Sequence, residues 1–178
     1  VTSDSQVSAA FDKMSRDGTE IDVLVNDAGI REKTNLMTAT DEIWDKIMNT
    51  NLKGYWHVLK YGTPLMRRNG IILMISSALS LNLDPDQAVY SLSKYSVNGL
   101  VALSKKTWPD LKFKTASLGA VRTGLFSHDK SEEYIRKAEQ IFGGVEKPES
   151  VAKMLVDLIN SEDTELIFDY GTKGYFRR

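Results

Sequence analysis

The alternation of short apolar runs with longer amphipathic stretches limits the folds open to this chain more than any other feature. Strands are expected at four apolar runs, residues 21–25, 71–75, 113–118 and 166–168. Helices are expected around them, over residues 5–16, 40–68, 87–106 and 148–160. Successive strands joined by a helix run parallel, and right-handed crossovers place helices on both faces of the sheet. The pattern therefore predicts an α/β fold with a doubly wound parallel sheet.

Capping and turn residues set the expected ends of these elements. Asp4 can cap the first helix, and Thr40 opens the second. Pro64 breaks or kinks that second helix near its end. Asn69 and Gly70 predict a turn before the second strand. There is no internal repeat, and we expect residues 1–178 to form one domain.

Composition argues against several classes of protein. The formal net charge of −1 gives no basic field for nucleic acid. There is no cysteine, and the two histidines, His57 and His128, are too few and too scattered to indicate a metal site. No apolar run approaches the roughly 18 residues of a membrane span, and no signal peptide is visible. We therefore expect a cytoplasmic protein that binds neither nucleic acid nor a membrane.

Tyr90 and Lys94 are the candidate catalytic pair. They are four residues apart in an expected helix, so their side chains share one face. A free tyrosine titrates near ~10, and a nearby positive charge lowers its pKa toward neutral pH. Such a pair suits acid–base chemistry at a carbonyl or alcohol oxygen. Taken alone, a Tyr and a Lys at this spacing more often belong to an exposed helix face, so the neighbouring motifs decide between the two interpretations.

Small and polar residues follow the expected strands at their carboxyl ends, where parallel sheets bind ligands. They are Asn26, Ala28 and Gly29 after the first strand, Ser76 and Ser77 after the second, and Gly119, Val121 and Thr123 after the third. Small residues at such positions let a flat ligand approach the backbone. Turn geometry alone also explains the glycines, and a satisfied loop hydroxyl explains Ser77.

Five segments, in this order and spacing, resemble the short-chain dehydrogenase/reductase family. They are residues 26–29 (Asn-Asp-Ala-Gly), 49–54 (Asn-Thr-Asn-Leu-Lys-Gly), 70–77 (Gly-Ile-Ile-Leu-Met-Ile-Ser-Ser), 90–94 (Tyr-Ser-Leu-Ser-Lys) and 118–123 (Leu-Gly-Ala-Val-Arg-Thr). Each is weak alone, but together they span nearly the whole chain. The resemblance implies a Rossmann-like fold and hydride transfer between NAD or NADP and a small carbonyl or secondary alcohol substrate.

The resemblance also implies roles for the motif residues. Tyr90 would exchange a proton with the substrate oxygen, and Ser77 would hold that oxygen in place. Lys94 would lower the pKa of Tyr90 and bind the nicotinamide ribose. Asn51 would hold a water that links Lys94 to solvent, or would only kink its helix. Cofactor contacts would come from Tyr90 and Lys94 and from six strand-end residues, Asn26, Ala28, Gly29, Gly119, Val121 and Thr123.

The chain departs from the family pattern mainly at its amino end. It lacks the glycine-rich turn that receives the cofactor pyrophosphate. Val1 aligns just after the family's third strand, so the chain would hold strands four to seven of a longer dehydrogenase, and residues 21–25 would form a bare apolar sheet edge. Asp27 stands where the family has a second Asn, and Leu118 where it has Pro.

Residues 124–147 correspond to the family's substrate lid, with a short helix expected near 131–140. An apolar, mobile lid suits a small or medium carbonyl substrate. Arg122, at its entrance, would either pair a substrate carboxylate or stay solvated. The resemblance further implies a homodimer or homotetramer, formed through the helices at about 40–68 and 88–106.

Two other functions remain open besides an NAD(P)-dependent oxidoreductase. The missing glycine-rich turn and Leu118 favour a non-catalytic relative that acts as a binding or assembly module. A lyase or epimerase could use the same Tyr–Lys pair with a bound nucleotide, although the compact length and the Ser76-Ser77 motif disfavour it. We favour the oxidoreductase for the longer protein, and we expect the 178-residue chain alone to be an incomplete enzyme.

Overall fold

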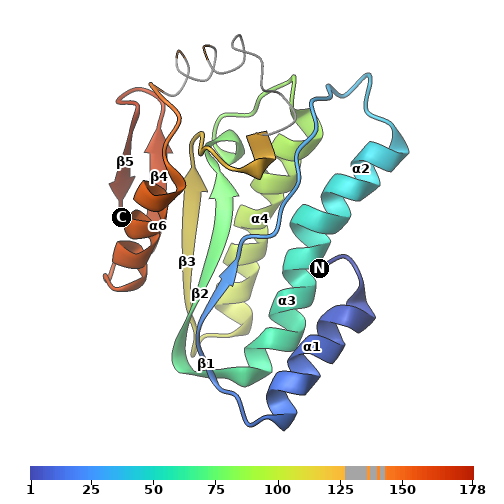
Figure 1. Cartoon of the computed structure of the whole chain (residues 1–178), viewed down its shortest axis with the longest axis vertical. Helices are drawn as coiled ribbons and strands as arrows, with labels where there is room; N and C mark the ends of the chain where they lie inside the picture. The colour runs from blue at the N-terminus through green and yellow to red at the C-terminus, as the bar shows by residue number, and fades with distance from the viewer. Residues whose placement is uncertain (127–135, 137–139, 141–142) are drawn as a thin grey trace.

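Five strands form a single sheet in the computed structural model, which describes residues 1–126, 136, 140 and 143–178 (Figure 1). The strand order is β1-β2-β3-β4-β5, in sequence order. The strands are β1 (Ile21–Asn26), β2 (Met66–Ser77), β3 (Lys112–Leu118), β4 (Glu165–Asp169) and β5 (Gly174–Arg177). The pairings from β1 to β4 are parallel, and β5 is antiparallel to β4. The predicted parallel sheet is confirmed, while β5 was not expected from the sequence.

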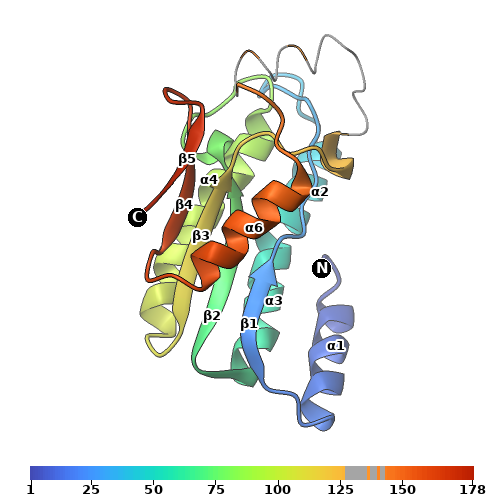
Figure 2. The ribbon, with the colours of Figure 1, turned by 60° about the vertical axis from the view of Figure 1, so that its left-hand side comes forward.

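Helices cover both faces of this sheet, as predicted. The α-helices are α1 (Asp4–Arg16), α2 (Asp41–Met48), α3 (Gly54–Gly62), α4 (Ala88–Thr107) and α6 (Pro148–Ile159). Helices α1, α3 and α4 lie on one side of the sheet, and α6 crosses the other side (Figure 2). The predicted Thr40 cap is confirmed, because its Oγ1 accepts a hydrogen bond from the N–H of Ile43. Asp4 was the wrong cap for α1, where Ser3 accepts from the N–H of Gln6.

The single helix expected over residues 40–68 is wrong. A π-helical turn, Asn49–Lys53, separates α2 from α3, and a 3-10 turn at Thr63–Leu65 follows α3. Pro64 lies in this 3-10 turn, where its missing N–H and fixed φ are tolerated while the helix ends. The chain then enters β2 at once, five residues before the expected strand start. Helical periodicity did not show these breaks because the apolar residues keep their spacing across them.

The turn expected at Asn69 and Gly70 lies inside β2. Asn69 has a φ of 63°, in the left-handed region that turns use. The strand register changes at this point, since Ile21 pairs with Met66 whereas Val23 pairs with Ile71. Three additional residues of β2 are therefore accommodated in a bulge. The residue types indicated a change of direction correctly, but the strand continues through it.

Two apolar cores, one on each face, hold the helices to the sheet. The first contains Tyr55 and Leu59 of α3, Val97 and Val101 of α4, and Ile72, Met74 and Phe113 of the strands. The second contains Leu158 of α6 with Leu73, Ile75, Ala116 and Leu166 of the strands. Neighbouring residues of β2 enter different cores because side chains alternate along a strand.

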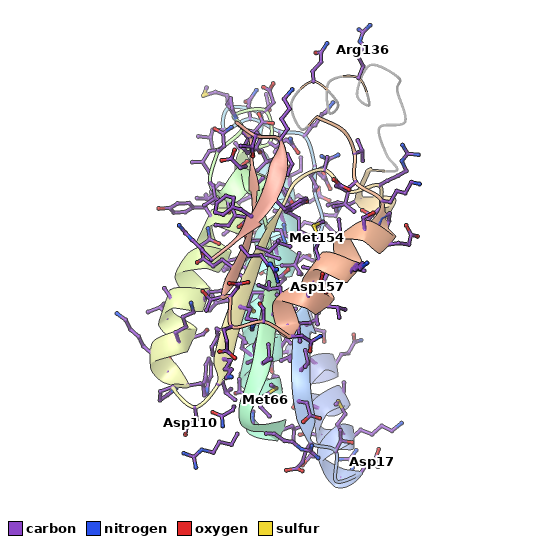
Figure 3. The ribbon with its side chains drawn as sticks, turned by 90° about the vertical axis from the view of Figure 1, so that its left-hand side faces the viewer. Asp17, Met66, Asp110, Arg136, Met154 and Asp157 are labelled. Carbon is purple, nitrogen blue, oxygen red and sulfur yellow. The ribbon has the colours of Figure 1, made fainter. Side chains whose placement is uncertain are left out.

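The outer strand β1 is incompletely covered, as expected for a bare edge. Val23 and Val25 are 39% and 48% exposed. Leu24, between them, packs against the core of α3 and α4, so the two valines face the side of α6. The amino ends of the parallel strands lie at one end of the sheet, near Asp17, Met66 and Asp110, whereas Arg136 lies beyond the opposite end (Figure 3). Ligands of a parallel sheet are expected at that opposite, carboxyl end.

Lys114 fastens the end of α6 to β3. Its buried ammonium donates hydrogen bonds to the backbone carbonyls of Leu158, Ser161 and Asp163, over 2.7, 2.6 and 2.8 Å. The last carbonyls of a helix have no partner within the helix. Lys114 binds one of them, that of Leu158, and two carbonyls of the segment that follows α6. Desolvation lowers the pKa of Lys114, while the negative charge of Glu162 opposes this shift.

We expect Lys114→Met to lower the free energy of unfolding by about 1–3 kcal/mol, because buried carbonyls lose their donor. Urea unfolding followed by circular dichroism measures this change. Lys112→Met is the matched control, since Lys112 is exposed two residues earlier on the same strand. Equal effects of the two substitutions would contradict a specific role of Lys114.

Candidate active site

A cavity of about 590 Å³ opens at the carboxyl ends of the parallel strands. Its wall is built from the ends of β1 and β2, the first turns of α4 and α6, and the segment after β3. Segments far apart in sequence meet here because the carboxyl ends of parallel strands share one edge of the sheet. The cavity therefore lies at the carboxyl ends of the strands, where the sequence predicted a ligand-binding site.

Three of the four predicted catalytic residues line this cavity. Ser77 ends β2, and its Oγ accepts a hydrogen bond of 3.2 Å from the N–H of Leu79. Tyr90 and Lys94 lie one helical turn apart at the start of α4, and both are buried. Ser77, Tyr90 and Lys94 thus line one cavity, although they come from a strand end and from a helix.

Lys94 is held by two oxygens. Its Nζ donates to the carbonyl of Ile75 over 2.9 Å and to the hydroxyl of Tyr55 over 3.3 Å. The hydroxyl of Tyr55 donates in turn to the same carbonyl over 2.8 Å, and Lys94 Nζ lies 5.2 Å from the centre of the Tyr55 ring. Tyr55 was not predicted from the sequence, because a buried aromatic residue on an amphipathic helix indicates only packing.

Burial changes the titration of this site. Desolvation lowers the pKa of Lys94 from 10.5 to about 8, although the nearby carboxylate of Asp27 opposes the shift. The pKa of Asp27 is itself raised by desolvation at the cavity wall, and Lys94 opposes that shift. Burial also raises the pKa of Tyr55, so its hydroxyl remains protonated. A mostly charged lysine at neutral pH is consistent with the electrostatic role expected of Lys94.

Asn51 lies beside the cavity but does not line it. It sits in the π-helical turn, where its Oδ1 accepts from the N–H of Ile30 and its Nδ2 donates to the carbonyl of Ile30, each over 2.9 Å. The same Nδ2 donates to Ser93 Oγ over 3.0 Å. These contacts favour the second of the two roles considered for Asn51, a structural one, because they fix the loop after β1 to two helices.

The predicted residues after β1 divide into two groups. Ala28 and Gly29 line the cavity, together with Asp27. Asn26 is buried away from it and donates to the carbonyl of Tyr55 over 3.1 Å. We therefore assign Asn26 to holding α3 against the sheet, rather than to a cavity contact.

Gly119, Val121 and Thr123 all line the cavity after β3. At Gly119 an added Cβ would lie 2.8 Å from the ring of Phe168, so close packing against β4 already requires a glycine. The Gly119 N–H donates to the hydroxyl of Tyr175, on β5. Arg122 is exposed and does not line the cavity. Of the expected lid, residues 127–135, 137–139 and 141–142 lie outside the described residues, as does most of its expected helix.

We expect Lys94→Met to raise the free energy of unfolding at pH 7 by about 1–3 kcal/mol. The substitution removes a buried charge, and this gain exceeds the cost of losing two hydrogen bonds. Above pH 8 the folded protein loses the Lys94 proton, whereas the unfolded chain keeps it to near 10.5. The unfolded state then binds more protons, so the parent protein gains stability as pH rises. The difference in the free energy of unfolding between Lys94→Met and the parent protein should therefore narrow from pH 8 to 10.5. Urea unfolding at several pH values measures it. A difference that is constant over this range would contradict the lowered pKa.

Among the residues that the structure describes, no group of three His, Cys, Asp or Glu side chains is placed to hold a metal ion. None of the described helices has the length and apolar character needed to cross a membrane.

Comparison with known proteins identifies the family. A family model described as enoyl-(acyl carrier protein) reductase matches residues 1–167. The 3-oxoacyl-(acyl-carrier-protein) reductase FabG of Thermotoga maritima is 32% identical over 173 residues, which are 92% of this chain and 69% of that protein. The corresponding reductase of Staphylococcus aureus is 33% identical, over 63% of this chain and 45% of its own length.

Solved structures agree with this result. The aldohexose dehydrogenase of Thermoplasma acidophilum has a TM-score of 0.77 and 26% identity, over 89% of this chain and 68% of its own. The angucycline C-6 ketoreductase LanV, solved with bound NADP, has a TM-score of 0.76 over 88% of this chain and 64% of its own. At 24% identity, LanV supports the fold alone. The chain belongs to the short-chain dehydrogenase/reductase family.

Proposed function

We propose that the protein transfers a hydride between NAD or NADP and a small carbonyl or secondary alcohol substrate. The observation that carries this proposal is the meeting of Ser77, Tyr90 and Lys94 in one cavity at the carboxyl end of the sheet. Family membership supports the reaction class, because the relatives named above include two reductases and a dehydrogenase. The substrate is a small molecule bound in this cavity.

In this proposal each residue has a separate task. The bound nicotinamide supplies or accepts the hydride. Tyr90 gives its hydroxyl proton to the substrate oxygen as a carbonyl becomes an alcohol, and takes the proton back in the reverse direction. Ser77 donates a hydrogen bond to the same oxygen and orients it. The positive charge of Lys94 favours the phenolate of Tyr90.

Small residues in the cavity wall would leave room for a flat nicotinamide ring. An added Cβ at Gly29 would lie 3.6 Å from Lys94 Nζ and 3.5 Å from Asn51 Oδ1, so a larger residue there would fill the space in front of Lys94. Ala28, Val121 and Thr123 add small or medium side chains to the same wall. We assign these residues and Gly119 to cofactor contacts, with Lys94 binding the ribose.

A non-catalytic binding or assembly module is the second candidate, for this chain taken alone. The exposed Val23 and Val25 leave β1 as an uncovered apolar edge, which favours association with further polypeptide. The chain also spans 69% and 45% of the two reductases to which it was compared. Under this alternative the cavity would bind its ligand without turnover.

Three further assignments belong to the same proposal. Residues 124–147 would close over the substrate as a lid within one domain, and the protein would act in the cytoplasm. The protein would form a homodimer or homotetramer through α2 and α3, which replace the helix expected at 40–68, and through α4. Trp56 on α3 is 42% exposed and Leu103 on α4 is 65% exposed, which supports an interface there.

We expect Tyr90→Phe to lower turnover by about 10²- to 10⁴-fold, because the proton donor is removed while the ring still packs. Cofactor affinity, measured by fluorescence titration with NADH or NADPH, should change little. Tyr95→Phe is the matched control, since Tyr95 lies on the same helix and is exposed. Unchanged turnover in Tyr90→Phe would refute this role of Tyr90.

Asn51→Ala separates the two roles considered for Asn51. We expect the free energy of unfolding to fall by about 1–3 kcal/mol, because both backbone groups of Ile30 lose their partner. The pH profile of kcat should keep its shape, with Asn49→Ala, exposed in the same π-helical turn, as control. A shifted pH profile with unchanged stability would instead support a proton relay through Asn51.

A further inference from the structure

Both ends of Lys94 are tied to one strand. Its backbone carbonyl accepts a hydrogen bond from Ser76 Oγ over 3.2 Å, and its Nζ donates to the carbonyl of Ile75 over 2.9 Å. Ser76 and Ile75 are neighbours on β2. A lysine on its flexible four-carbon stem can otherwise point in many directions. These contacts therefore keep the ammonium at one place in the cavity wall.

The hydroxyl of Tyr55 is the second acceptor for this ammonium. It donates its proton to the carbonyl of Ile75 over 2.8 Å, which leaves its oxygen to accept from Lys94 Nζ over 3.3 Å. Tyr55 is fully buried and does not line the cavity. Desolvation raises its pKa, and the negative charge of Asp27 adds to this shift. Tyr55 is therefore a neutral acceptor for Lys94 rather than a second acid at the substrate.

The end of β1 connects this buried acceptor to the cavity. Asn26, the last residue of β1, is buried and donates from Nδ2 to the carbonyl of Tyr55 over 3.1 Å. The next residue, Asp27, is exposed and lines the cavity. Successive side chains of an extended chain point in opposite directions. One residue thus holds Tyr55 from inside the fold, while its neighbour places a carboxylate at the cavity.

Asp27 supplies a negative charge that acts on Lys94. Desolvation lowers the pKa of Lys94, and the charge of Asp27 opposes this shift. An added Cβ at Gly29 would lie 3.6 Å from Lys94 Nζ and 3.7 Å from the carbonyl oxygen of Asp27. The glycine therefore leaves no side chain of its own between the two residues. Attraction between opposite charges is stronger in such a partly desolvated wall than in water.

The other charged or titratable groups in the described part of the cavity wall are Arg31 and Tyr90. Arg31 lies on the loop after β1 and donates to Gln87 Oε1 over 3.3 Å. Tyr90 lies one turn before Lys94 on the same helix. Among the described groups, Asp27 is the one whose charge shifts the pKa of Lys94.

We infer that Tyr55 and Asp27 are positioning residues that keep Lys94 charged one helical turn from Tyr90. Tyr55 acts as a buried hydrogen-bond acceptor, and Asp27 acts as an opposite charge at the cavity wall. The inference rests on the proposed function, because the charge of Lys94 affects turnover only if Tyr90 transfers a proton. Together the two residues would set the pH range in which the proposed reaction proceeds.

The titration of Lys94 tests this inference without turnover. In protein that contains 13C-labelled lysine, the Cε resonance of Lys94 is identified by its absence in Lys94→Met and is followed by NMR from pH 6 to 11. Tyr55→Phe keeps the ring and removes the acceptor. It should lower the midpoint by about one pH unit, because a hydrogen bond to a charged group is worth roughly this much. Asp27→Asn should lower it by about 0.5 to 1 pH unit.

Matched variants separate these roles from general effects of substitution. Tyr61→Phe alters a hydroxyl on the same helix that contacts Asp4 instead, and Asp22→Asn removes an exposed carboxylate of β1. Both should leave the midpoint unchanged, as should Asp27→Glu, which keeps the charge. The Asp27 variants provide the test if Tyr55→Phe folds poorly, because Asp27 is exposed. An unchanged midpoint in Tyr55→Phe or in Asp27→Asn would overturn the role of that residue.

The pH profile of kcat tests the consequence for the proposed reaction. Reduction of ethyl acetoacetate and cyclohexanone with NADH or NADPH is measured from pH 6 to 9. Lys94 of Tyr55→Phe loses its proton at lower pH than Lys94 of the parent protein. Its kcat should therefore be close to that of the parent protein at pH 6 and about tenfold lower at pH 9. A merely structural role of Tyr55 would lower kcat equally at every pH.

The two measurements distinguish failure of the inference from failure of the proposed reaction. Lowered midpoints in Tyr55→Phe and Asp27→Asn, with no turnover of either substrate by the parent protein, would support the inferred control of Lys94 and overturn the oxidoreductase. Turnover with the same midpoint and pH profile in all variants would do the reverse. Unchanged midpoints without turnover would overturn both.

Discussion

The burial of one ammonium group organises the site. Lys94 cannot leave water without partners for its charge, and the carbonyl of Ile75 and the hydroxyl of Tyr55 provide them. These partners belong to β2 and α3, so satisfying Lys94 fixes α4 against both elements. Tyr90, one turn earlier on α4, is thereby held at the cavity that Ser77, at the end of β2, also lines. The contacts of Lys94 with Ile75 and Tyr55 therefore hold α4 against the first apolar core and also place the site.

The sequence predicted those elements of the fold that depend on residues close to one another along the chain. Buried strands are short apolar runs and capped helices have local periodicity, so the parallel sheet with helices on both faces followed from the sequence. The π-helical turn did not, because it depends on Asn51 reaching the backbone of Ile30, 21 residues away. Strand β5 was also missed, since Gly174–Arg177 is short and partly exposed and becomes a strand only by pairing with β4.

The sequence predicted those site residues whose positions follow from the regular geometry of a helix or a strand. Tyr90 and Lys94 share a helix face, and Ser77 follows a strand, so their positions follow from local structure. Asn26 has the same sequence signal but points into the fold, because the direction of a side chain at a strand end depends on the neighbouring elements. Tyr55 was missed for a related reason. Nothing near it in sequence indicates that Lys94 of α4 becomes its partner.

Lys94 links proton transfer in the proposed reaction to pH. Lys94 is buried and its pKa is lowered to about 8, so its charge depends on its surroundings and responds to a ligand or to pH. A rise in pH above 8 would therefore weaken the electrostatic support of Tyr90 by Lys94. Proton transfer at Tyr90 would then depend on pH through a neighbouring residue, because the charge of Lys94 is buried.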